Sequence, residues 1–313
     1  MNIKKLTYPK ISRLKPGDPI TYFNRAVVTH KIDGTNGRLI WDGEELIAGS
    51  RNQTLVGGHD NFNFSEWVDS NIDIESFEEN FANVDVVVFG EFFRDSINGR
   101  VEYGDNSRFR VFDIFINSVF LDWSDVVGVA ENSLGLDVVP HSYMNNPDKE
   151  KLENYIKDYN DPLAKEEANE EERIGEGVVA RPPVEMKYKK DNRVIYKIKS
   201  EKFAEVKKGT NKSSGSSNSR FSEKEKAKVE KYITENRIFS VVSNMAEADP
   251  AFEVSMQITG NVIEETIKDI KEEADEEFDD QLMGKHGGGE VARVFKKMIN
   301  KGKFQKINST LNN

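Results

Sequence analysis

The chain has 313 residues, of which 37% are hydrophobic and 32% are charged, and its formal net charge is −11. This composition is typical of a soluble globular protein, and the length allows two domains with a sizeable core. The absence of cysteine excludes disulfide bonds and thiolate zinc sites, and the lack of any signal-peptide-like or bilayer-spanning apolar segment predicts a cytoplasmic protein.

The first predicted element is a strand at residues 26–29 that leads to Lys31, and a hairpin with strands at 38–41 and 46–48 follows it. Between them, Lys31 is followed by the turn-forming pair Asp33-Gly34 and by small polar residues, an arrangement that presents an amine to a phosphate. Taken alone, a tetrapeptide such as Lys31-Ile32-Asp33-Gly34 usually marks a surface turn.

Attack on phosphorus would require Lys31 in its neutral form. A lysine with an ordinary pKa near ~10.4 is neutral about one time in a thousand at neutral pH. Neighbouring cations and a bound metal can lower such a pKa by roughly 2 to 3 units. If Lys31 is a covalent nucleophile, the chain must therefore place cations beside it.

The residues from 84 to 93 form a nearly continuous apolar run, which predicts a strand buried on both faces. Glu91 is the exception in this run. A buried carboxylate is costly unless it is paired or binds a metal or a ligand, so we interpret Glu91 as a functional residue. The next predicted strand, 108–116, contains Phe112. The sequence pattern by itself indicates that Phe112 packs in the core.

Two further features mark the last strands of this first region. Glu176 precedes Gly177, whose missing side chain permits a close approach of another backbone. Lys197 and Lys199 alternate with Ile198, which places both amines on one face of a strand. Two like charges on one face are unfavourable without an anion between them, and a nucleoside triphosphate is such an anion. These amines are also the cations that would lower the pKa of the nucleophile.

The composition predicts two domains. Residues 208–221 are rich in serine and predict a flexible linker. We therefore divide the chain into a first domain, 1–207, and a second domain, 222–313.

The second domain is predicted to be helical. Ser222 and Glu225 form a capping box, and two further helices are expected near 261–278 and 290–301. The glycines at 287–289 are interpreted as a helix connector rather than a phosphate-binding loop, because no strand precedes them and no Gly-Lys-Ser/Thr ending follows.

The order of these residues resembles the covalent nucleotidyltransferase superfamily of polynucleotide ligases and mRNA capping enzymes. Its successive motifs correspond here to Lys31-Ile32-Asp33-Gly34, Ser50-Arg51, Phe89-Gly90-Glu91-Phe92, Arg110-Val111-Phe112-Asp113, Glu176-Gly177-Val178-Val179 and Tyr196-Lys197-Ile198-Lys199. The residues after Lys31, the stretch GEFF and the stretch VEYGDNSRFRVFDI look most like the RNA ligase 2 family, which includes phage RNA ligases and kinetoplastid RNA-editing ligases. This resemblance covers residues 31–199, and a looser one continues into the C-terminal region.

The resemblance implies an α+β fold, with a nucleotidyltransferase (adenylation) domain of antiparallel sheets and flanking helices, and a small all-α C-terminal domain. It implies that Lys31 is the catalytic nucleophile and that Glu176 binds the metal. Phe112 would stack on adenine, and Arg51, unless it is a solvated turn residue, would contact a phosphate or the RNA 5′ end. The residues implied to contact the nucleotide are His30, Lys31, Asn36, Arg51, Glu91, Phe112, Lys197 and Lys199.

The resemblance also implies the substrates. ATP is the expected donor, because residues 1–30 leave little room for the segment that NAD-dependent ligases carry ahead of their nucleophile. Mg²⁺ is the expected metal, with Mn²⁺ as an alternative. The expected polymer is RNA, sealed at nicks in duplex RNA or in an RNA/DNA hybrid, as in phage-type (bacteriophage) RNA repair, by a monomer that does not bind membranes.

Some observations leave alternatives open. Asp33 stands where some RNA ligase 2 members have histidine, and aspartate is usual there in DNA ligases. The negative net charge is unfavourable for binding nucleic acid, although much of the acid lies in residues 166–172 and 269–280, which can face away from a substrate. A DNA ligase or a capping enzyme would usually carry a β-barrel after the last lysine motif, where this chain is predicted to be helical. A further alternative is a catalytically silent RNA-binding relative. The presence of Lys31 argues against this alternative, because such a protein would not need to keep the nucleophile.

Overall fold

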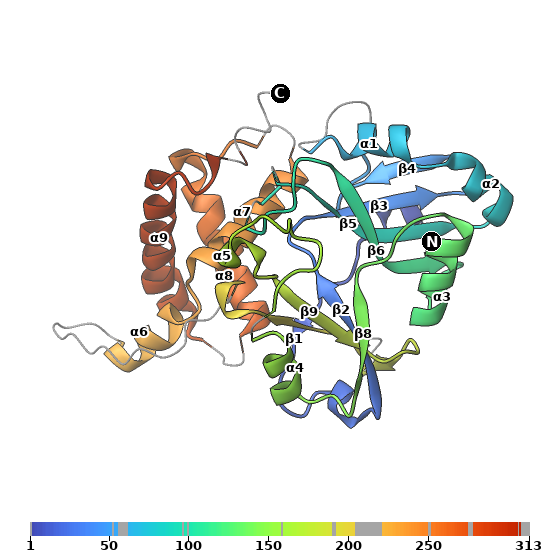
Figure 1. Cartoon of the computed structure of the whole chain (residues 1–313). Helices are drawn as coiled ribbons and strands as arrows, with labels where there is room; N and C mark the ends of the chain where they lie inside the picture. The colour runs from blue at the N-terminus through green and yellow to red at the C-terminus, as the bar shows by residue number, and fades with distance from the viewer. Residues whose placement is uncertain are drawn as a thin grey trace. The chain divides into compact units, whose positions relative to one another are not determined.

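Two five-stranded sheets form the framework of the N-terminal part of the chain in the computed structural model (Figure 1). The chain divides into two compact units, Met1–Lys202 and Phe203–Asn313. The structure describes residues 2–51, 53–55, 62–95, 97–98, 100–157, 159–189, 192–203, 221–249, 252–274, 278–305 and 307. The predicted domain boundary at 207 and the predicted linker up to residue 220 lie outside this described part. The predicted α+β class is confirmed, with sheets in the first unit and helices in the second.

The first sheet carries the predicted nucleophile. Its strands are, in spatial order, β1 (Ser12–Arg13), β12 (Tyr196–Lys199), β9 (Gly177–Arg181), β2 (Arg25–Lys31) and β8 (His141–Asn145). All neighbours are antiparallel except β1 and β12, which run parallel. One face packs Val28, Val178 and Ile198 against Leu152 of α4 (Lys149–Tyr155). Because side chains alternate along a strand, Lys31 and Lys199 lie on the opposite face.

The second sheet contains the strand in which Glu91 was expected. Its strands are, in spatial order, β4 (Leu46–Gly49), β3 (Thr35–Trp41), β5 (Val86–Phe93), β6 (Arg108–Ile116) and β7 (Val119–Phe120). Every residue of β5 is buried, as its apolar run predicted. The predicted hairpin is confirmed, with Leu39 opposite Ala48.

The two faces of the second sheet are covered differently. Helices α1 (Phe64–Asn71) and α2 (Ile74–Phe81) lie on one face (Figure 1). On this face, the ring of Phe64 packs on Phe92 at a centroid distance of 4.9 Å. The other face carries an apolar cluster that includes Ile40 and Phe89. Glu91, two residues after Phe89, therefore shares this second face.

The remaining elements of the first unit are short. The remaining α-helices and strands are α3 (Trp123–Val127), α5 (Glu170–Arg173), β10 (Lys187–Tyr188) and β11 (Asn192–Arg193), and they are accompanied by short 3₁₀ and π-helical turns such as Pro19–Tyr22 and Gly128–Ser133. No helix in the described part of the chain has the length and apolar character that crossing a membrane requires.

The second unit consists, in its described residues, of helices around one apolar core. They are α6 (Glu223–Glu230), α7 (Glu235–Ala248), α8 (Thr259–Glu273), a π-helical turn (Leu282–Gly287) and α9 (Gly288–Asn300). The capping box predicted at Ser222 is confirmed in both of its bonds.

The interpretation of the three glycines at 287–289 as a connector is wrong, because they lie within continuous helical backbone. A side chain at Gly287 would come within 3.3 Å of Val229, and one at Gly288 within 3.2 Å of Ile263. Gly287 and Gly288 therefore allow close helix packing, whereas nothing lies within 4 Å of a Cβ at Gly289.

Candidate active site

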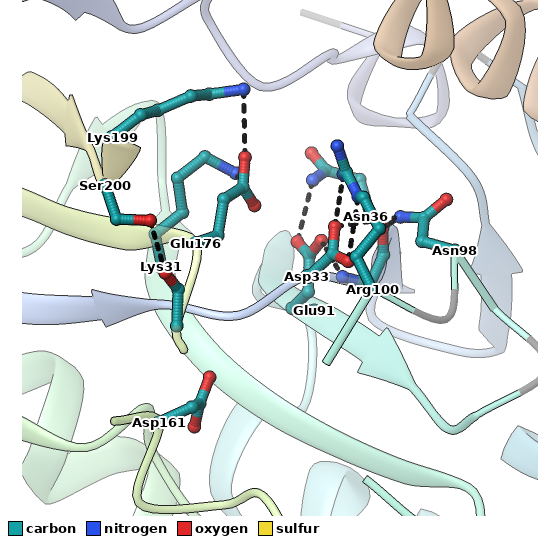
Figure 2. A network of polar contacts seen from close by, with 12 residues as sticks. Lys31, Asp33, Asn36, Glu91, Asn98, Arg100, Asp161, Glu176, Lys199 and Ser200 are labelled. Atoms are coloured by element: carbon teal, nitrogen blue, oxygen red, sulfur yellow. Dashed lines mark hydrogen bonds and ion pairs between the residues drawn. The ribbon is translucent and has the colours of Figure 1, made fainter. Parts of the chain in front are cut away.

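Lys31, Gly177 and Lys199 form one row across three adjacent strands. Gly177 of β9 pairs with Lys31 of β2 on one side and with Lys199 of β12 on the other. Residues directly opposite each other in a sheet project from the same face, so the two amines lie side by side. Both amines point to Glu176: Lys31 Nζ is 2.8 Å from Oε2, and Lys199 Nζ is 2.9 Å from Oε1 (Figure 2). The sequence predicted that these residues act together, and the structure brings them together.

Gly177 makes this row possible. Its φ is +151°, and a Cβ at this position would lie 2.0 Å from the carbonyl oxygen of Ile198 and 2.8 Å from Cα of Lys199. No side chain fits in such a space. The backbone of Ser200 donates to the carbonyl of Glu176 at 2.9 Å, and its hydroxyl donates to that of Gly175 at 2.7 Å. The backbone that carries Glu176 is thereby fixed against β12.

Glu176 is buried, with 5% of its side chain exposed. Burial alone raises the pKa of a carboxyl group, but here the charges of Lys31, Lys199 and Arg100 outweigh it and lower the pKa of Glu176 to about 2. The site therefore contains a buried carboxylate that stays ionised beside the amines of Lys31 and Lys199.

The lowered pKa of Glu176 predicts a specific acid sensitivity. The carboxylate contributes stability that is fully present above its ordinary pKa of 4.5 and is lost as the pH falls toward about 2. The effect is on the order of 3 kcal/mol. We expect urea titrations at pH 6 and pH 3 to give a smaller pH-dependent loss of unfolding free energy for Glu176→Gln than for the wild type. Equal losses in the two proteins would contradict this assignment.

Glu91 holds the turn that follows the nucleophile. Its Oε1 accepts from the backbone N–H of Gly34 at 3.2 Å, and its Oε2 accepts from Asn36 Nδ2 at 3.0 Å (Figure 2). Asn36 and Glu91 lie directly opposite each other on β3 and β5. A Cβ on Gly34 would come within 2.4 Å of the carbonyl oxygen of Phe92, so glycine is required there. The predicted functional residues Asn36 and Glu91 thus meet at the start of β3.

The structure adds a group of residues that the sequence reasoning missed. The carboxylate of Asp33, which is 1% exposed, forms an ion pair with Arg100. Asn98 Nδ2 donates to the carbonyl of Gly34 at 2.7 Å, and the backbone N–H of Asp33 donates to the hydroxyl of Tyr103 at 3.0 Å. These partners lie some 65 residues away in sequence, in a region without periodicity, so no local pattern could have revealed them.

Phe112 lies on the same face of the second sheet as Glu91. Its ring packs edge-on against Tyr8 at 4.9 Å, and the Tyr8 hydroxyl donates to Asp113 at 2.8 Å. Consecutive strand residues normally point to opposite faces, but a register irregularity at Phe89 interrupts the pairing here. Both Phe112 and Asp113 can therefore face Tyr8. The position of Phe112 is partly core packing, and its contact with adenine stays a prediction.

Asp113 is a structural residue between the two sheets. It is fully buried and contacts Arg181 at 3.1 Å and Arg193 at 2.7 Å. Arg181 belongs to the first sheet, whereas Asp113 belongs to the second. This buried ion cluster therefore connects the sheet that carries Lys31 with the sheet that carries Glu91.

Arg51 lies in a loop that Arg38 holds in place. The buried guanidinium of Arg38 donates to the carbonyl of Ser50 at 2.5 Å and to that of Gln53 at 2.8 Å. Arg51 itself forms no hydrogen bond or ion pair with any described residue. Arg38 thus holds the loop that carries Arg51, and the contact of Arg51 with a phosphate stays a prediction.

His30 and Lys197 differ in their relation to the row. His30 lies on the opposite face of β2 from Lys31, where its ring packs edge-on on Tyr159 at 4.9 Å. Burial lowers the pKa of His30 to about 4, so the imidazole is neutral at pH 7. The structure therefore does not place the His30 side chain beside those of Lys31, Lys199 and Glu176. Lys197 lies on the same face of the sheet as Lys31. It pairs with Val179, two residues along β9 from Gly177.

The donor set around Lys31 fits a nucleotide with a divalent metal. In the described part of the chain, no three His, Asp or Glu side chains converge as a protein-only metal site. Mg²⁺ is usually held by one or two carboxylates together with waters and substrate phosphates, so Glu176 alone is a sufficient protein anchor. Each of its oxygens keeps a second lone pair beyond the one used by an amine.

Comparison with known proteins gave matches to solved structures and to a family model. An RNA ligase of Naegleria gruberi, solved as a mutant with AMP and Mn, shares 17% identity and a TM-score of 0.43, with 62% of this chain and 57% of that chain covered. An archaeal ATP-dependent RNA ligase shares 15% identity and a TM-score of 0.48, with 94% of this chain and 65% of that chain covered. This chain thus spans less than two thirds of either protein. The family model described as RNA ligase matches residues 24–199, which is more than half of the chain and includes every residue of the Lys31 row, and the chain therefore belongs to the RNA ligase family.

Proposed function

We propose that this chain is an ATP-dependent RNA ligase of the RNA ligase 2 type that works through a lysyl-AMP intermediate. The observation that carries the proposal is the position of Lys31 and Lys199 on the two oxygens of the buried Glu176 carboxylate. A nucleophilic amine, a second cation and an ionised carboxylate are the groups that transfer of a nucleotidyl group needs in one place.

In the first step, the neutral amine of Lys31 attacks the α-phosphorus of ATP. A P–N bond forms, the P–O bond to pyrophosphate breaks, and the attacking nitrogen releases one of its protons to solvent. The ammonium form of Lys31, which Glu176 holds at 2.8 Å, has no free electron pair. This ion pair therefore has to open, and the proton has to leave, before attack. Lys199 remains beside the site as a positive charge for phosphate oxygens.

The next two steps move AMP onto RNA and then release it. An oxygen of the RNA 5′-phosphate attacks the AMP phosphorus, and the P–N bond to Lys31 breaks. The RNA 3′-hydroxyl then attacks the activated 5′-phosphate, and AMP leaves. Bound Mg²⁺ supplies charge neutralisation at the phosphates, and Glu176 would hold it. We assign Asn36 and Glu91 to the ribose side and Arg51 to a phosphate or the RNA 5′ end.

The direct test is incubation of the full chain with labelled ATP and magnesium, followed by denaturing electrophoresis. We expect a labelled covalent protein band. The absence of a band under all metal conditions would place the chain in the class of RNA-binding relatives without ligase activity. A stronger band with labelled GTP than with ATP would favour a capping-type enzyme.

We further propose that the second unit contacts duplex RNA and thereby directs the enzyme to nicks, as in phage-type RNA repair. The solvent face of α9 and the turn after it carry five exposed cations: Arg293, Lys296, Lys297, Lys301 and Lys303. Lys297 and Lys301 approach the same carboxylate, Glu235, at 3.1 and 3.9 Å. Arg293 pairs with Glu290. Two carboxylates thus face five cations, so this face keeps a positive surplus in a chain with a net charge of −11. A row of phosphates is a complementary partner.

Charge reversal tests this surface. Lys296→Glu/Lys303→Glu should weaken binding of nicked duplex RNA about 10-fold and reduce the salt slope of log K by roughly 2, because each lysine would lose one phosphate contact. Lys157→Glu/Lys268→Glu is the matched control, since it changes the net charge by the same amount at other exposed positions. Both proteins should form lysyl-AMP at the wild-type rate. Equal RNA affinities for the two double variants would remove α9 from RNA binding.

A further inference from the structure

Arg100 neutralises a buried charge two residues after the nucleophile. Its Nε contacts Asp33 Oδ2 at 3.1 Å, and a second guanidinium nitrogen bonds to Oδ1. Such a two-point contact fixes both the distance and the orientation of the carboxylate. Removing one partner of a buried pair leaves an uncompensated charge, which is strongly unfavourable. The orientation of the Asp33 side chain thus depends on Arg100.

The segment around Arg100 also holds the backbone of the same turn. Asn98 bonds to the carbonyl of Gly34, and Tyr103 accepts from the N–H of Asp33 and donates to Asp161 at 2.8 Å. Figure 2 shows Asn98 and Arg100 on the side of Asp33 away from Glu176. Side chains of this one segment therefore bind the carboxylate, an N–H and a carbonyl of the turn.

A third contact links Arg100 to the segment before Glu176. Lys202 Nζ donates to the carbonyl of Arg100 and, at 2.6 Å, to the carbonyl of Glu171. Arg100 is thus held between the turn after Lys31 and the segment that leads to the carboxylate beneath it. These contacts connect the turn after Lys31 with the segment before Glu176.

We propose that Arg100 is a positioning residue for the adenylation step: through Asp33 it holds the turn after β2 so that Lys31 is aimed at the α-phosphorus. This inference rests on the proposed function and extends it to a residue outside the ligase motifs. Arg100 touches Asp33 rather than the reacting atoms, so its contribution lies in the geometry of the attack. A displacement of about 1 Å at a reacting atom can cost on the order of 100-fold in rate.

The experiment compares four proteins with the wild type: Arg100→Met, Arg100→Lys, Arg100→Met/Asp33→Asn, and Arg237→Met. The last is the matched control, because Arg237 is a buried arginine that pairs with Asp269 in the second unit. For each protein, lysyl-AMP formation is measured against ATP concentration to separate kcat from KM, and thermal unfolding is recorded. The double variant is essential, because it leaves no unpaired buried charge and should fold even if Arg100→Met does not.

We expect kcat for Arg100→Met to fall about 100-fold with KM for ATP changed less than about threefold, because the aim of Lys31 is lost rather than nucleotide binding. Arg100→Lys should recover part of kcat. The double variant should regain the wild-type melting temperature but keep a kcat at least about 10-fold low, and Arg237→Met should keep the wild-type kcat.

A double variant with both wild-type stability and wild-type kcat would overturn the proposal, because Arg100 would then be a counter-ion alone. A wild-type kcat in Arg100→Met would overturn it as well, with the ligase assignment intact. If the wild type itself forms no adduct, the proposed function and this inference fall together.

Discussion

Lys31→Ala is expected to abolish the labelled protein–AMP band, a loss limited only by the detection range of the gel. The reason is chemical, because no other side chain in the row can form the P–N bond from the same place. Lys31→Arg should be equally inactive, since a guanidinium stays protonated and cannot act as a nucleophile. Denaturing electrophoresis after incubation with labelled ATP and magnesium provides the measurement.

Two companion measurements make this prediction specific to Lys31. Lys157→Ala, which removes an exposed lysine of the same unit, should leave the band unchanged. The Lys31→Ala protein should still join RNA that is supplied already adenylated, because that step needs the pocket and no new lysyl-AMP. An acid-labile AMP adduct on the Lys31→Ala protein would refute the assignment of the nucleophile.

Gly177→Ala is expected to have the second-largest effect, although it adds only one methyl group. The new Cβ would meet the carbonyl oxygen of Ile198 at 2.0 Å and would need a φ of +151°, which residues with a side chain rarely adopt. Strain and displacement together should cost roughly 3 kcal/mol or more. Strands β9 and β12 would move apart at the row that holds Lys31 and Lys199. Formation of lysyl-AMP should fall on the order of 100-fold.

Gly128→Ala is the matched glycine control. Gly128 has helical backbone angles, and nothing lies within 4 Å of the position of its Cβ. This change should leave adenylation intact and should maintain or raise stability by up to ~1 kcal/mol, because alanine restricts the unfolded chain. Thermal melts and adduct yields of the two variants can be compared side by side. If Gly177→Ala behaves like Gly128→Ala, the close approach of β9 to β12 does not limit the site.

The sequence by itself determined the strands that carry the predicted site residues and the shared face of Lys197 and Lys199. Alternation placed Lys197 and Lys199 on one face because the period of a strand is two. The apolar run around Glu91 predicted a buried carboxylate, and the structure confirms that Glu91 is buried and bonded to Gly34 and Asn36. These features depend on local patterns, and local patterns are readable without a fold.

Only the tertiary structure decided which residues surround the nucleophile and which do not. His30 follows the motif order but lies on the other face of β2, because adjacent strand residues point in opposite directions. A register irregularity in the β5–β6 pair allows Phe112 to face Tyr8, and irregular pairing leaves no periodic signal. Arg100 reaches Asp33 across 67 residues of sequence. The sequence indicates that a buried carboxylate such as Asp33 needs a cationic partner, but it does not identify that partner. Only the fold, which brings the segment around Arg100 back to the turn, determines that the partner is Arg100.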